Sequence, residues 1–277
     1  MPELPEVETV VRQLDALVKG RRIVLARLIR ERLAPHSPQR EFCDNLARAT
    51  LNFVHRRGKH VLFDLDNDRT LITHLRMSGR FILLPEDRSD PKFAHAVFHL
   101  DDGNKLIFDD QRHFGLMRIV ETRALYDSPE LAKLAPEPFS DEFSQIHFAA
   151  ALKRSKRNLK EFLLDQTKVC GLGNIYASEA MFIARVRPTV RADRLTGPKT
   201  VRLHNAIRAV LRETIELGTR LPIDPANIGG SIYGAGSEAA WRVYGREGEP
   251  CDRCGFSIKR IRQGGRSTYF CPNCQRR

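Results

Sequence analysis

Six cysteines are present, and the four nearest the C-terminus have a spacing that is typical of metal binding. They form the pairs "CDRC" and "CPNC", with sixteen residues between the pairs. Four thiolates complete the tetrahedral shell of zinc, so this ion would have a structural role and would not activate water. Two neighbouring disulfides are the alternative that the spacing leaves open. The sequence predicts one structural Zn²⁺ bound by Cys251, Cys254, Cys271 and Cys274.

The N-terminus offers a second kind of chemistry. The chain begins "MPELPEVETV", which places Pro2 and Glu3 directly behind the initiator methionine. Removal of Met1 would expose the secondary amine of Pro2 beside a carboxylate. A terminal amine with a pKa near 8 is about one tenth unprotonated at pH 7, far more than a lysine, so it suits a nucleophile. The plainer interpretation is a helix start with proline in the first turn.

Positive charge is concentrated in the second half of the chain. The net charge is +12, and residues 133–277 hold 25 Lys and Arg against 14 Asp and Glu. This asymmetry favours a polyanionic partner such as nucleic acid, with a solubilising basic surface as the alternative. No apolar run is long enough for a membrane span, and the N-terminus resembles no targeting peptide, so we expect a cytoplasmic protein.

These groups must be positioned by elements of two kinds. Helical spacing of apolar residues predicts a helix over 5–19, with Gly20 as its end. Short strands without helices between them, typical of a sandwich or barrel, are predicted at 22–29, 59–66, 70–75, 80–84, 96–110 (a hairpin around "DDGN") and 116–120. Helices are predicted at 148–154, 157–165, 174–184 and 197–218, and a hairpin with a Gly-Gly turn at 256–270.

Other motifs do not decide between function and structure by themselves. "GLGNIYASE" places Asn174 at the start of a predicted helix, where backbone N–H groups favour an anion, but a plain helix connection has the same pattern. Met77 and Phe114 beside glycines could insert between bases if they are exposed, although such residues are usually in a core. Lys59 in "RRGKHVLF" fits either a phosphate ligand or a solvated basic loop.

Taken together, the motifs resemble one family. "PELPEVET", "RRGKHVLF", "HLRMSGRF", "QRHFG", "GLGNIYASE", "VYGREGEPC" and the four-cysteine finger occur in this order along nearly the whole chain. The sequence is thereby similar to the formamidopyrimidine-DNA glycosylase/endonuclease VIII family. The resemblance implies an α+β multidomain fold with an N-terminal helix and β-sandwich, a helix–two-turn–helix domain and a C-terminal zinc finger hairpin. We expect the catalytic domain at 1–132, a linker at 133–147, the DNA-binding domain at 148–244 and the finger at 245–277.

The resemblance also implies an activity. The family removes oxidised bases from double-stranded DNA by flipping the lesion out of the duplex, and then cuts the strand at the abasic site. Pro2 matches the nucleophile, Glu3 the general acid/base and Glu6 a residue bordering the base pocket. The phosphate-binding residues of the family match Lys59, His74, Asn174 and Arg266. We also group Lys59 with the catalytic residues. Lys156 is a further expected DNA contact. Met77, Arg112 and Phe114 match the residues that fill the gap left by the flipped base, with Arg112 facing the opposite cytosine.

Two departures from the family pattern concern substrate choice. Gln111 stands where the family commonly has proline, and segment 227–245 looks shorter than the usual one, which closes over a flipped 8-oxoguanine. We therefore expect formamidopyrimidines to be better substrates than 8-oxoguanine. The alternatives are an endonuclease VIII-like enzyme for oxidised pyrimidines and a non-catalytic zinc-finger DNA-binding protein. A monomer is the expected oligomeric state.

Overall fold

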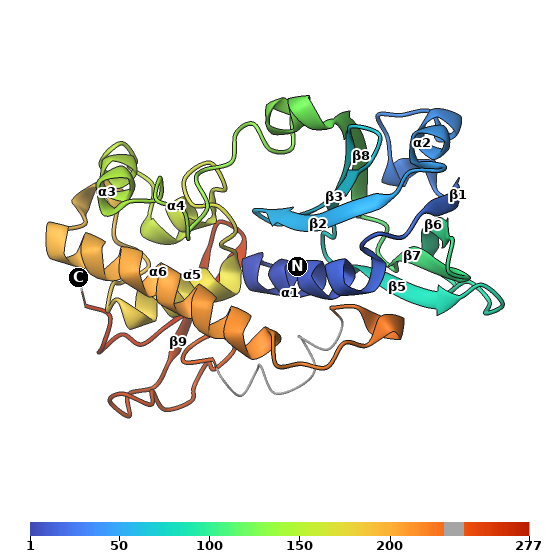
Figure 1. Ribbon diagram of the computed structural model, residues 1–277. Coiled ribbons are helices and arrows are strands. Elements are labelled where there is room, and N and C mark those ends of the chain that lie inside the picture. The colour runs from blue at the N-terminus through green and yellow to red at the C-terminus, as the bar shows by residue number, and fades with distance from the viewer. Residues whose placement is uncertain (230–240, 277) are drawn as a thin grey trace. The chain divides into compact units, whose positions relative to one another are not determined.

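The computed structural model describes residues 1–229 and 241–276, and the chain divides into two compact units (Figure 1). The first unit contains Met1–Ala132 and Leu217–Ile232, and the second contains Lys133–Glu216 and Tyr233–Arg277. Among the described residues, no helix has the length and apolar character needed to cross a membrane. Pro2 and Glu3 belong to the first unit, and the four cysteines predicted as metal ligands belong to the second.

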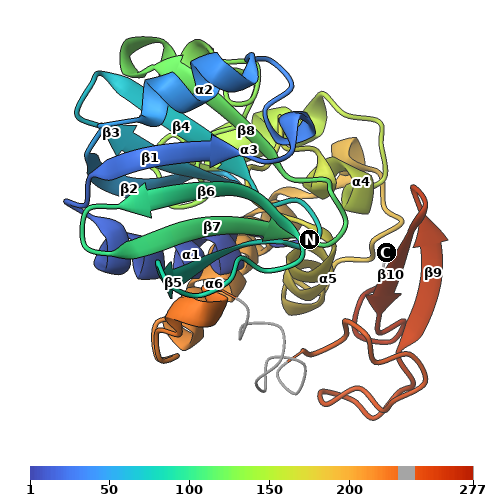
Figure 2. The same ribbon diagram turned by 90° about the vertical axis from the view of Figure 1, so that its right-hand side faces the viewer.

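The first unit is a β-sandwich of two four-stranded antiparallel sheets (Figures 1 and 2). One sheet has the order β1-β6-β7-β5, formed by β1 (Ile23–Leu28), β6 (Ala94–Leu100), β7 (Asn104–Asp110) and β5 (Gly79–Pro85). The other has the order β2-β3-β4-β8, formed by β2 (Leu51–Arg57), β3 (His60–Leu65), β4 (Arg69–His74) and β8 (Leu116–Glu121). Apolar residues of these strands form the main core, and a smaller separate cluster contains Ile82, Ala94, Val97 and Ile107.

Helix α1 (Leu4–Val18) packs against β2, and its apolar stripe, which includes Val7, Leu14 and Val18, is fully buried in that core. This unit also contains η1 (Glu31–Leu33), α2 (Gln39–Leu46) and η2 (Thr122–Asp127). After α6 (Gly197–Gly218) the chain returns to the sandwich through η4 (Pro225–Asn227), and Ile228 forms a β-bridge with Phe81. The segment after η4 packs closely against α1, because a Cβ on Gly229 would collide with the side chain of Val10.

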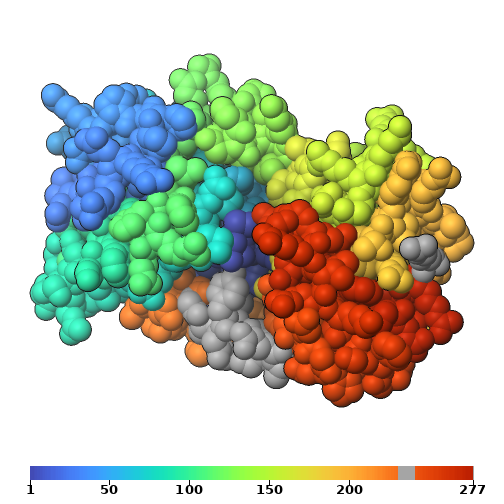
Figure 3. Space-filling model, turned by 180° about the vertical axis from the view of Figure 1, so that it is seen from behind, coloured from blue at the N-terminus to red at the C-terminus, as the bar shows by residue number. Residues whose placement is uncertain are grey.

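The second unit is helical and carries a small hairpin at its C-terminal end. Its helices are α3 (Gln145–Lys153), α4 (Leu159–Leu164), α5 (Asn174–Ile183), η3 (Ala192–Arg194) and α6 (Gly197–Gly218), whose last two residues belong to the first unit. Strands β9 (Lys259–Gln263) and β10 (Arg266–Phe270) pair around Gly264 and Gly265. Both glycines have positive φ, of 52° and 76°, as a two-residue type I′ turn requires. We call residues 245–276, which contain this hairpin and the four cysteines, the hairpin module. Figure 3 shows it, in dark orange to red, as one continuous part of the surface.

The expected fold class is confirmed, including the N-terminal helix, the sandwich, the helical part and the four-cysteine hairpin. Among the α-helices and strands of the described residues, two escaped the sequence prediction. Strand β2 and helix α2 were not expected, because "LNFVHRR" ends in basic residues and "QREFCDNL" has few apolar ones. Helix α3 begins at Gln145, inside the segment expected as a linker, where Ser144 caps it by accepting the N–H of His147.

Candidate active site and zinc centre

The N-terminal residues are fixed by the start of α1. Glu3 is the N-cap residue, and a capping box joins it to Glu6: each side chain accepts the backbone N–H of the other residue, with Glu3 N and Glu6 Oε2 2.8 Å apart. Both glutamates are only 3% exposed. Pro2 is buried as well, whereas Met1 is 41% exposed. The predicted nucleophile and general acid are therefore held by a packed helix and do not belong to a fraying tail.

Lys59 lies in the two-residue turn between β2 and β3. Gly58 has a φ of 59°, and Arg57 pairs with His60 across the turn. Arg56 attaches this turn to α1, because its guanidinium bonds Glu8 Oε2 at 2.9 Å and donates to the carbonyl of Gly58 at 3.0 Å. Lys59 itself is only 5% exposed. The interpretation of "RRGK" as a solvated loop is therefore wrong.

The site residues of the first unit surround the terminal amine. Burial lowers the pKa of the amine of Met1 below its ordinary value, and the positive charges of Lys59 and Arg112 act in the same direction. The carboxylates of Glu3 and Glu6 oppose this effect. The structure thus brings together, around one amine, four residues that the sequence analysis selected from three separate motifs.

Asp110, at the end of β7, organises the loop that carries Arg112 and Phe114. Its fully buried carboxylate accepts the backbone N–H groups of Phe114 and Gly115, both at 2.7 Å, and of Arg112 at 3.2 Å. It also accepts the hydroxyl of Ser78 from the β4–β5 loop. Burial opposes ionisation of this carboxyl, but the hydrogen bonds outweigh burial and hold its pKa below the usual range. Sequence reasoning missed Asp110, since an aspartate before a turn is common.

This arrangement exposes the three residues expected to fill the gap in the duplex. Met77 and Phe114 are both 45% exposed, and the guanidinium of Arg112 lies over the ring of Phe114 at 5.3 Å. The neighbouring glycines are needed for packing: a Cβ on Gly115 would meet the ring of Phe108 at 2.5 Å, and one on Gly79 would meet the carbonyl of Leu75 at 2.5 Å. Neither Met77 nor Phe114 is a core residue, as the resemblance had indicated.

His74, at the end of β4, is held as a neutral imidazole. Its Nδ1 accepts the backbone N–H of Arg76 at 3.0 Å, and its ring meets that of His60 edge-on with centroids 4.7 Å apart. Burial, followed by the charges of His60, Arg76 and Lys59, lowers its pKa far below the ordinary value. A neutral His74 with Nδ1 as acceptor carries its proton on Nε2, and this N–H is a suitable donor to a phosphate oxygen.

In the second unit, Asn174 is the first residue of α5, and its side-chain amide donates to the carbonyl of Ser267 at 2.9 Å. Ser267 follows the exposed Arg266 on β10, so this bond brings the two predicted phosphate ligands together. Lys160 stabilises the first turn of α5, because its fully buried ammonium donates to the carbonyl of Asn174 at 2.8 Å and to Ser178 Oγ at 2.6 Å. Sequence reasoning missed Lys160, because a lysine in an amphipathic helix is expected to be exposed.

Lys156 is exposed in the connection between α3 and α4. It lines a basic hollow of the second unit together with Arg154, Arg157 and Lys168. Within this hollow, Arg157 is paired with Asp165 at 3.1 Å. The hollow is a suitable surface for phosphate groups, and it explains part of the charge asymmetry of the chain.

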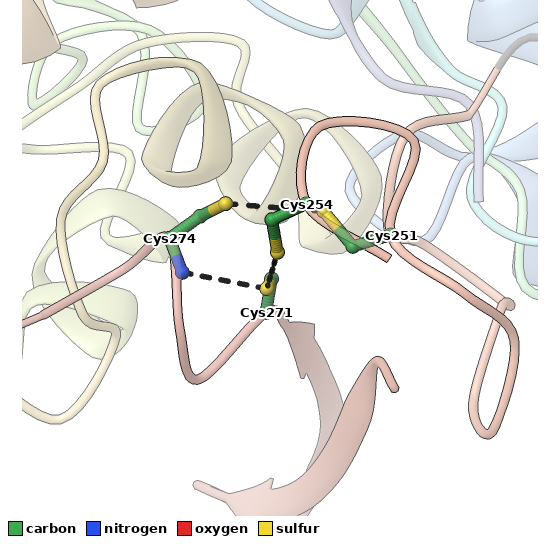
Figure 4. A group of neighbouring side chains, drawn as sticks. All are labelled: Cys251, Cys254, Cys271 and Cys274. Atoms are coloured by element: carbon green, nitrogen blue, oxygen red, sulfur yellow. Dashed lines mark hydrogen bonds between the residues drawn. The ribbon is translucent and has the colours of Figure 1, made fainter. Parts of the chain in front are cut away.

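The four cysteines predicted as metal ligands lie together (Figure 4), with all Sγ atoms within 4.8 Å of one another. The Sγ atoms of Cys251 and Cys274 are 3.9 Å apart and those of Cys254 and Cys271 3.6 Å apart. A tetrahedral site with Zn–S bonds of about 2.3 Å has sulfur atoms roughly 3.8 Å apart, so the geometry fits zinc. A hydrogen bond from the backbone of Phe256 lowers the pKa of Cys254 to about 6, whereas burial raises the pKa of Cys271 and raises that of Cys274 to about 12. The positions of the four sulfur atoms therefore carry the zinc assignment.

The zinc centre is attached to the helical part of the second unit. Arg253 stacks on the ring of Phe182 at 4.5 Å, and the buried Gln275 donates to the carbonyl of Val186 at 2.9 Å. The chain before the finger is held by the fully buried Glu179 of α5, whose carboxylate accepts the N–H groups of residues 242, 243 and 244. The motif "GNIYASE" therefore contacts the finger through Asn174, which bonds Ser267, and holds the chain before the finger through Glu179.

Three family models match successive parts of the chain. Residues 1–117 match the formamidopyrimidine-DNA glycosylase N-terminal domain, residues 134–222 the H2TH domain of the same enzyme, and residues 248–277 the zinc finger found in FPG and IleRS. The chain is 44% identical over 279 residues to a formamidopyrimidine-DNA glycosylase of Heliobacterium modesticaldum and 41% identical over 279 residues to one of Bacillus licheniformis, with 100% of each chain covered.

Solved structures show the same similarity. The Lactococcus lactis enzyme in complex with DNA that contains an abasic site matches with a TM-score of 0.91 and 33% identity, over 99% of this chain and 100% of that one. The wild-type Lactococcus lactis enzyme in complex with N7-benzyl-Fapy-dG containing DNA matches with a TM-score of 0.91 and 33% identity, over 100% of both chains. The family resemblance inferred from the motifs is thereby confirmed, and the chain belongs to the formamidopyrimidine-DNA glycosylase family.

Proposed function

We propose that this chain removes oxidised purines from double-stranded DNA and then cleaves the strand at the abasic site, with the amine of Pro2 as nucleophile. The observation that carries this proposal is the group of charged residues around the N-terminal amine, set by the capping box of α1. The substrates are formamidopyrimidines and, less efficiently, 8-oxoguanine. The glycosylase and the abasic-site lyase use the same amine, which makes the protein a bifunctional base-excision-repair enzyme. Its substrate is chromosomal DNA and its zinc site needs reduced cysteines, so a cytoplasmic location belongs to the proposal.

Each step of the proposed reaction has a candidate residue. The nitrogen of Pro2 forms a bond to C1′ of the damaged nucleotide and loses its proton. The bond from C1′ to the base breaks, and the base leaves with the bonding electron pair and takes up a proton. Glu3 donates a proton to the ring oxygen O4′ as the C1′–O4′ bond opens, which leaves an iminium between Pro2 and C1′. The iminium makes the C2′ proton acidic, so its removal expels the 3′ phosphate, and a second elimination expels the 5′ phosphate.

The electrostatics favour the amine as nucleophile. Attack requires the unprotonated amine, and the burial that lowers the pKa of the Met1 amine would act on Pro2 once Met1 is removed. Lys59 and Arg112 lower the pKa of the amine further. In the proposed complex the same two cations bind the DNA backbone and the base opposite the lesion.

Borohydride trapping on DNA with an abasic site tests the nucleophile. The protein lacking Met1 is expected to form a covalent adduct, while a preparation that retains Met1 forms none, because its Pro2 nitrogen is an amide. Pro2→Gly is expected to lose most of the adduct. Arg12→Gln, which removes the exposed guanidinium of the Arg12–Glu8 ion pair on the same helix, is the matched control and should retain the adduct. An adduct formed by the Met1-retaining protein, or at the original yield by Pro2→Gly, would contradict the assignment. Absence of any adduct would favour the non-catalytic DNA-binding alternative.

Oxidised pyrimidines are the second candidate substrate class. A similar solved structure is a complex of the wild-type Lactococcus lactis enzyme with DNA containing an oxidised pyrimidine, with a TM-score of 0.91 and 33% identity. Residues 230–240, which contain most of the segment that looked shortened, lie outside the described residues, so the preference for formamidopyrimidines rests on the sequence. A panel of duplexes with a formamidopyrimidine, 8-oxoguanine or an oxidised pyrimidine tests it. Equal excision rates for the two purine lesions would contradict the preference.

A further inference from the structure

Two histidines are in contact at the loop that carries Arg112 and Phe114: His113 lies in the loop itself, and His95 lies in a neighbouring strand. Nδ1 of His113 lies 2.9 Å from Nε2 of His95, which belongs to β6. The two rings are stacked, with centroids 4.9 Å apart and planes inclined by 29°, and the ring of Phe93 meets His113 edge-on at 6.2 Å. His95 is only 3% exposed, while His113 is exposed. No role proposed above uses either histidine.

The backbone at His113 explains why this contact matters. His113 has a φ of 60°, in the left-handed region that few residues other than glycine enter readily. It separates Arg112 from Phe114, so its conformation determines the direction in which both side chains leave the loop. Asp110 holds the N–H groups of Arg112, Phe114 and Gly115 through its carboxylate, and the N–H of His113 through its carbonyl at 3.2 Å. The side chain of His113 is held from another strand, by His95.

Burial keeps His95 in the form that this contact requires. A hydrogen bond between two imidazoles needs one donor and one acceptor nitrogen, so it is lost when both rings carry two protons. Burial lowers the pKa of His95, and the neighbouring His113 and Arg30 act in the same direction, while the negative charge of Asp110 opposes them. A neutral His95 can accept the N–H of His113 at Nε2.

We propose that His95 and His113 are positioning residues for recognition of the base opposite the lesion. By fixing the left-handed turn of the loop, their contact fixes Arg112 over Phe114 and aims its guanidinium at the base edge. This inference rests on the proposed function, in which Arg112 faces the opposite cytosine. Loss of the contact would leave Arg112 in place along the chain but free to adopt several directions, and binding to the correct base would lose more than binding to an incorrect one.

Three substitutions separate the contact from the backbone conformation. His113→Gly tolerates the positive φ but removes the side chain that contacts His95. His113→Asn also tolerates it, and its amide nitrogen occupies nearly the position of Nδ1, so the donor to His95 is kept. His95→Phe preserves the stacked ring and removes the acceptor nitrogen. A purely structural role of the pair would make all three changes alter stability without altering the choice of base.

The measurement is the ratio of kcat/KM for a formamidopyrimidine opposite cytosine to that for the same lesion opposite adenine. Arginine contacts to a base edge contribute substantial discrimination, so His113→Gly and His95→Phe are each expected to lower the ratio at least about fivefold. His113→Asn should keep a ratio within about twofold of the original, and the double variant His113→Gly with His95→Phe should lose no more than either single variant.

The outcomes distinguish the inference from the function on which it rests. If the unmodified protein does not excise the lesion, the proposed function has failed, whatever the variants do. If it excises the lesion with a preference for cytosine, and both His113→Gly and His95→Phe keep that preference, the positioning role is overturned. A loss of preference in His113→Asn equal to that in His113→Gly would also overturn it, and thermal unfolding of each variant identifies any that fails to fold.

Discussion

Replacing Asp110 by asparagine tests whether one buried carboxylate positions the loop that carries Arg112 and Phe114. The substitution preserves the shape of the side chain but removes its charge and converts one oxygen into a donor. One carboxylate oxygen accepts the N–H groups of Phe114 and Gly115, and the other accepts the hydroxyl of Ser78 and the N–H of Arg112. In the variant, the least costly arrangement keeps the amide oxygen toward Phe114 and Gly115 and turns the amide nitrogen toward Ser78, whose hydroxyl can rotate to accept.

The magnitude follows from the bonds that change. Two hydrogen bonds to a charged acceptor, worth about 1.5–3 kcal/mol each, become bonds to a neutral acceptor worth about 1 kcal/mol each. The bond from Arg112 N is lost, although this N–H also donates to Ser78 Oγ at 3.1 Å. Removing a buried charge offsets part of the loss, so we expect about 2 kcal/mol of destabilisation at pH 7. For a unit of this size that corresponds to a decrease in Tm of roughly 4–8 °C.

The direction of the pKa shift of Asp110 determines how the effect of Asp110→Asn on stability depends on pH. Hydrogen bonds hold the pKa of Asp110 below its unfolded value, against the effect of burial. Its contribution to stability is therefore complete above the unfolded pKa of about 3.9 and is lost as the pH falls through the lower folded pKa. The difference in unfolding free energy between the original protein and Asp110→Asn should accordingly shrink below about pH 4.

Urea unfolding followed by circular dichroism, at pH 7 and near pH 3.5, measures this difference. Glu121→Gln is the matched control in the same unit, because its ion pair with Arg123 is exposed and contributes little. The same preparations should show a lower preference for cytosine opposite the lesion in Asp110→Asn than in the control. A destabilisation that is absent at pH 7, or equally large at both pH values, would refute the assignment of Asp110 as an ionised acceptor.

Three further changes test the packing and the zinc centre. Removal of zinc by a chelator should unfold the hairpin module and abolish DNA binding while the β-sandwich signal in circular dichroism remains; retained binding would contradict a structural zinc. Lys160→Met removes a buried donor to the carbonyl of Asn174, so we expect a loss of about 1–3 kcal/mol of stability and weaker binding to all duplexes, measured against Lys133→Met as an exposed control in the same unit. Gly115→Ala places a Cβ 2.5 Å from Phe108, so we expect a lower Tm, and an unchanged Tm would show that the loop yields more easily than the close contact indicates.

Some of this molecule is evident from local pattern. The spacing of Cys251, Cys254, Cys271 and Cys274 predicts their convergence, because a four-thiolate site has few geometric solutions. The helical spacing of apolar residues predicts α1, and the Gly-Gly pair predicts the turn between β9 and β10. In each case the signal lies within one element or one short repeat, where spacing and conformation are directly related.

Buried charges were not predictable in the same way. Asp110, Lys160 and Glu179 are fully buried, and the side chain of Arg56 is only 9% exposed. Charged residues at such sequence positions are usually exposed, yet each of the four bonds a group from a distant part of the chain. Their burial depends on partners that are distant in the chain, and single-sequence periodicity contains no information on those partners. The exposure of Met77 has the same origin: the family resemblance indicated it, whereas residue type alone favoured the core.

The choice of proline as the second residue follows from the way α1 begins. Glu3 is fixed twice, since its backbone N–H bonds the carboxylate of Glu6 and its own carboxylate accepts the N–H of Glu6. The pyrrolidine ring then fixes the φ of Pro2, so that once Met1 is removed the direction of the amine depends on a single free backbone rotation. Glycine at this position would still present a terminal amine, but one with free rotation about two bonds and without the ring that fills the buried space. Because attack requires the nitrogen within about 3–3.5 Å of C1′ along one line, this loss of orientation accounts for the adduct that Pro2→Gly is expected to lose.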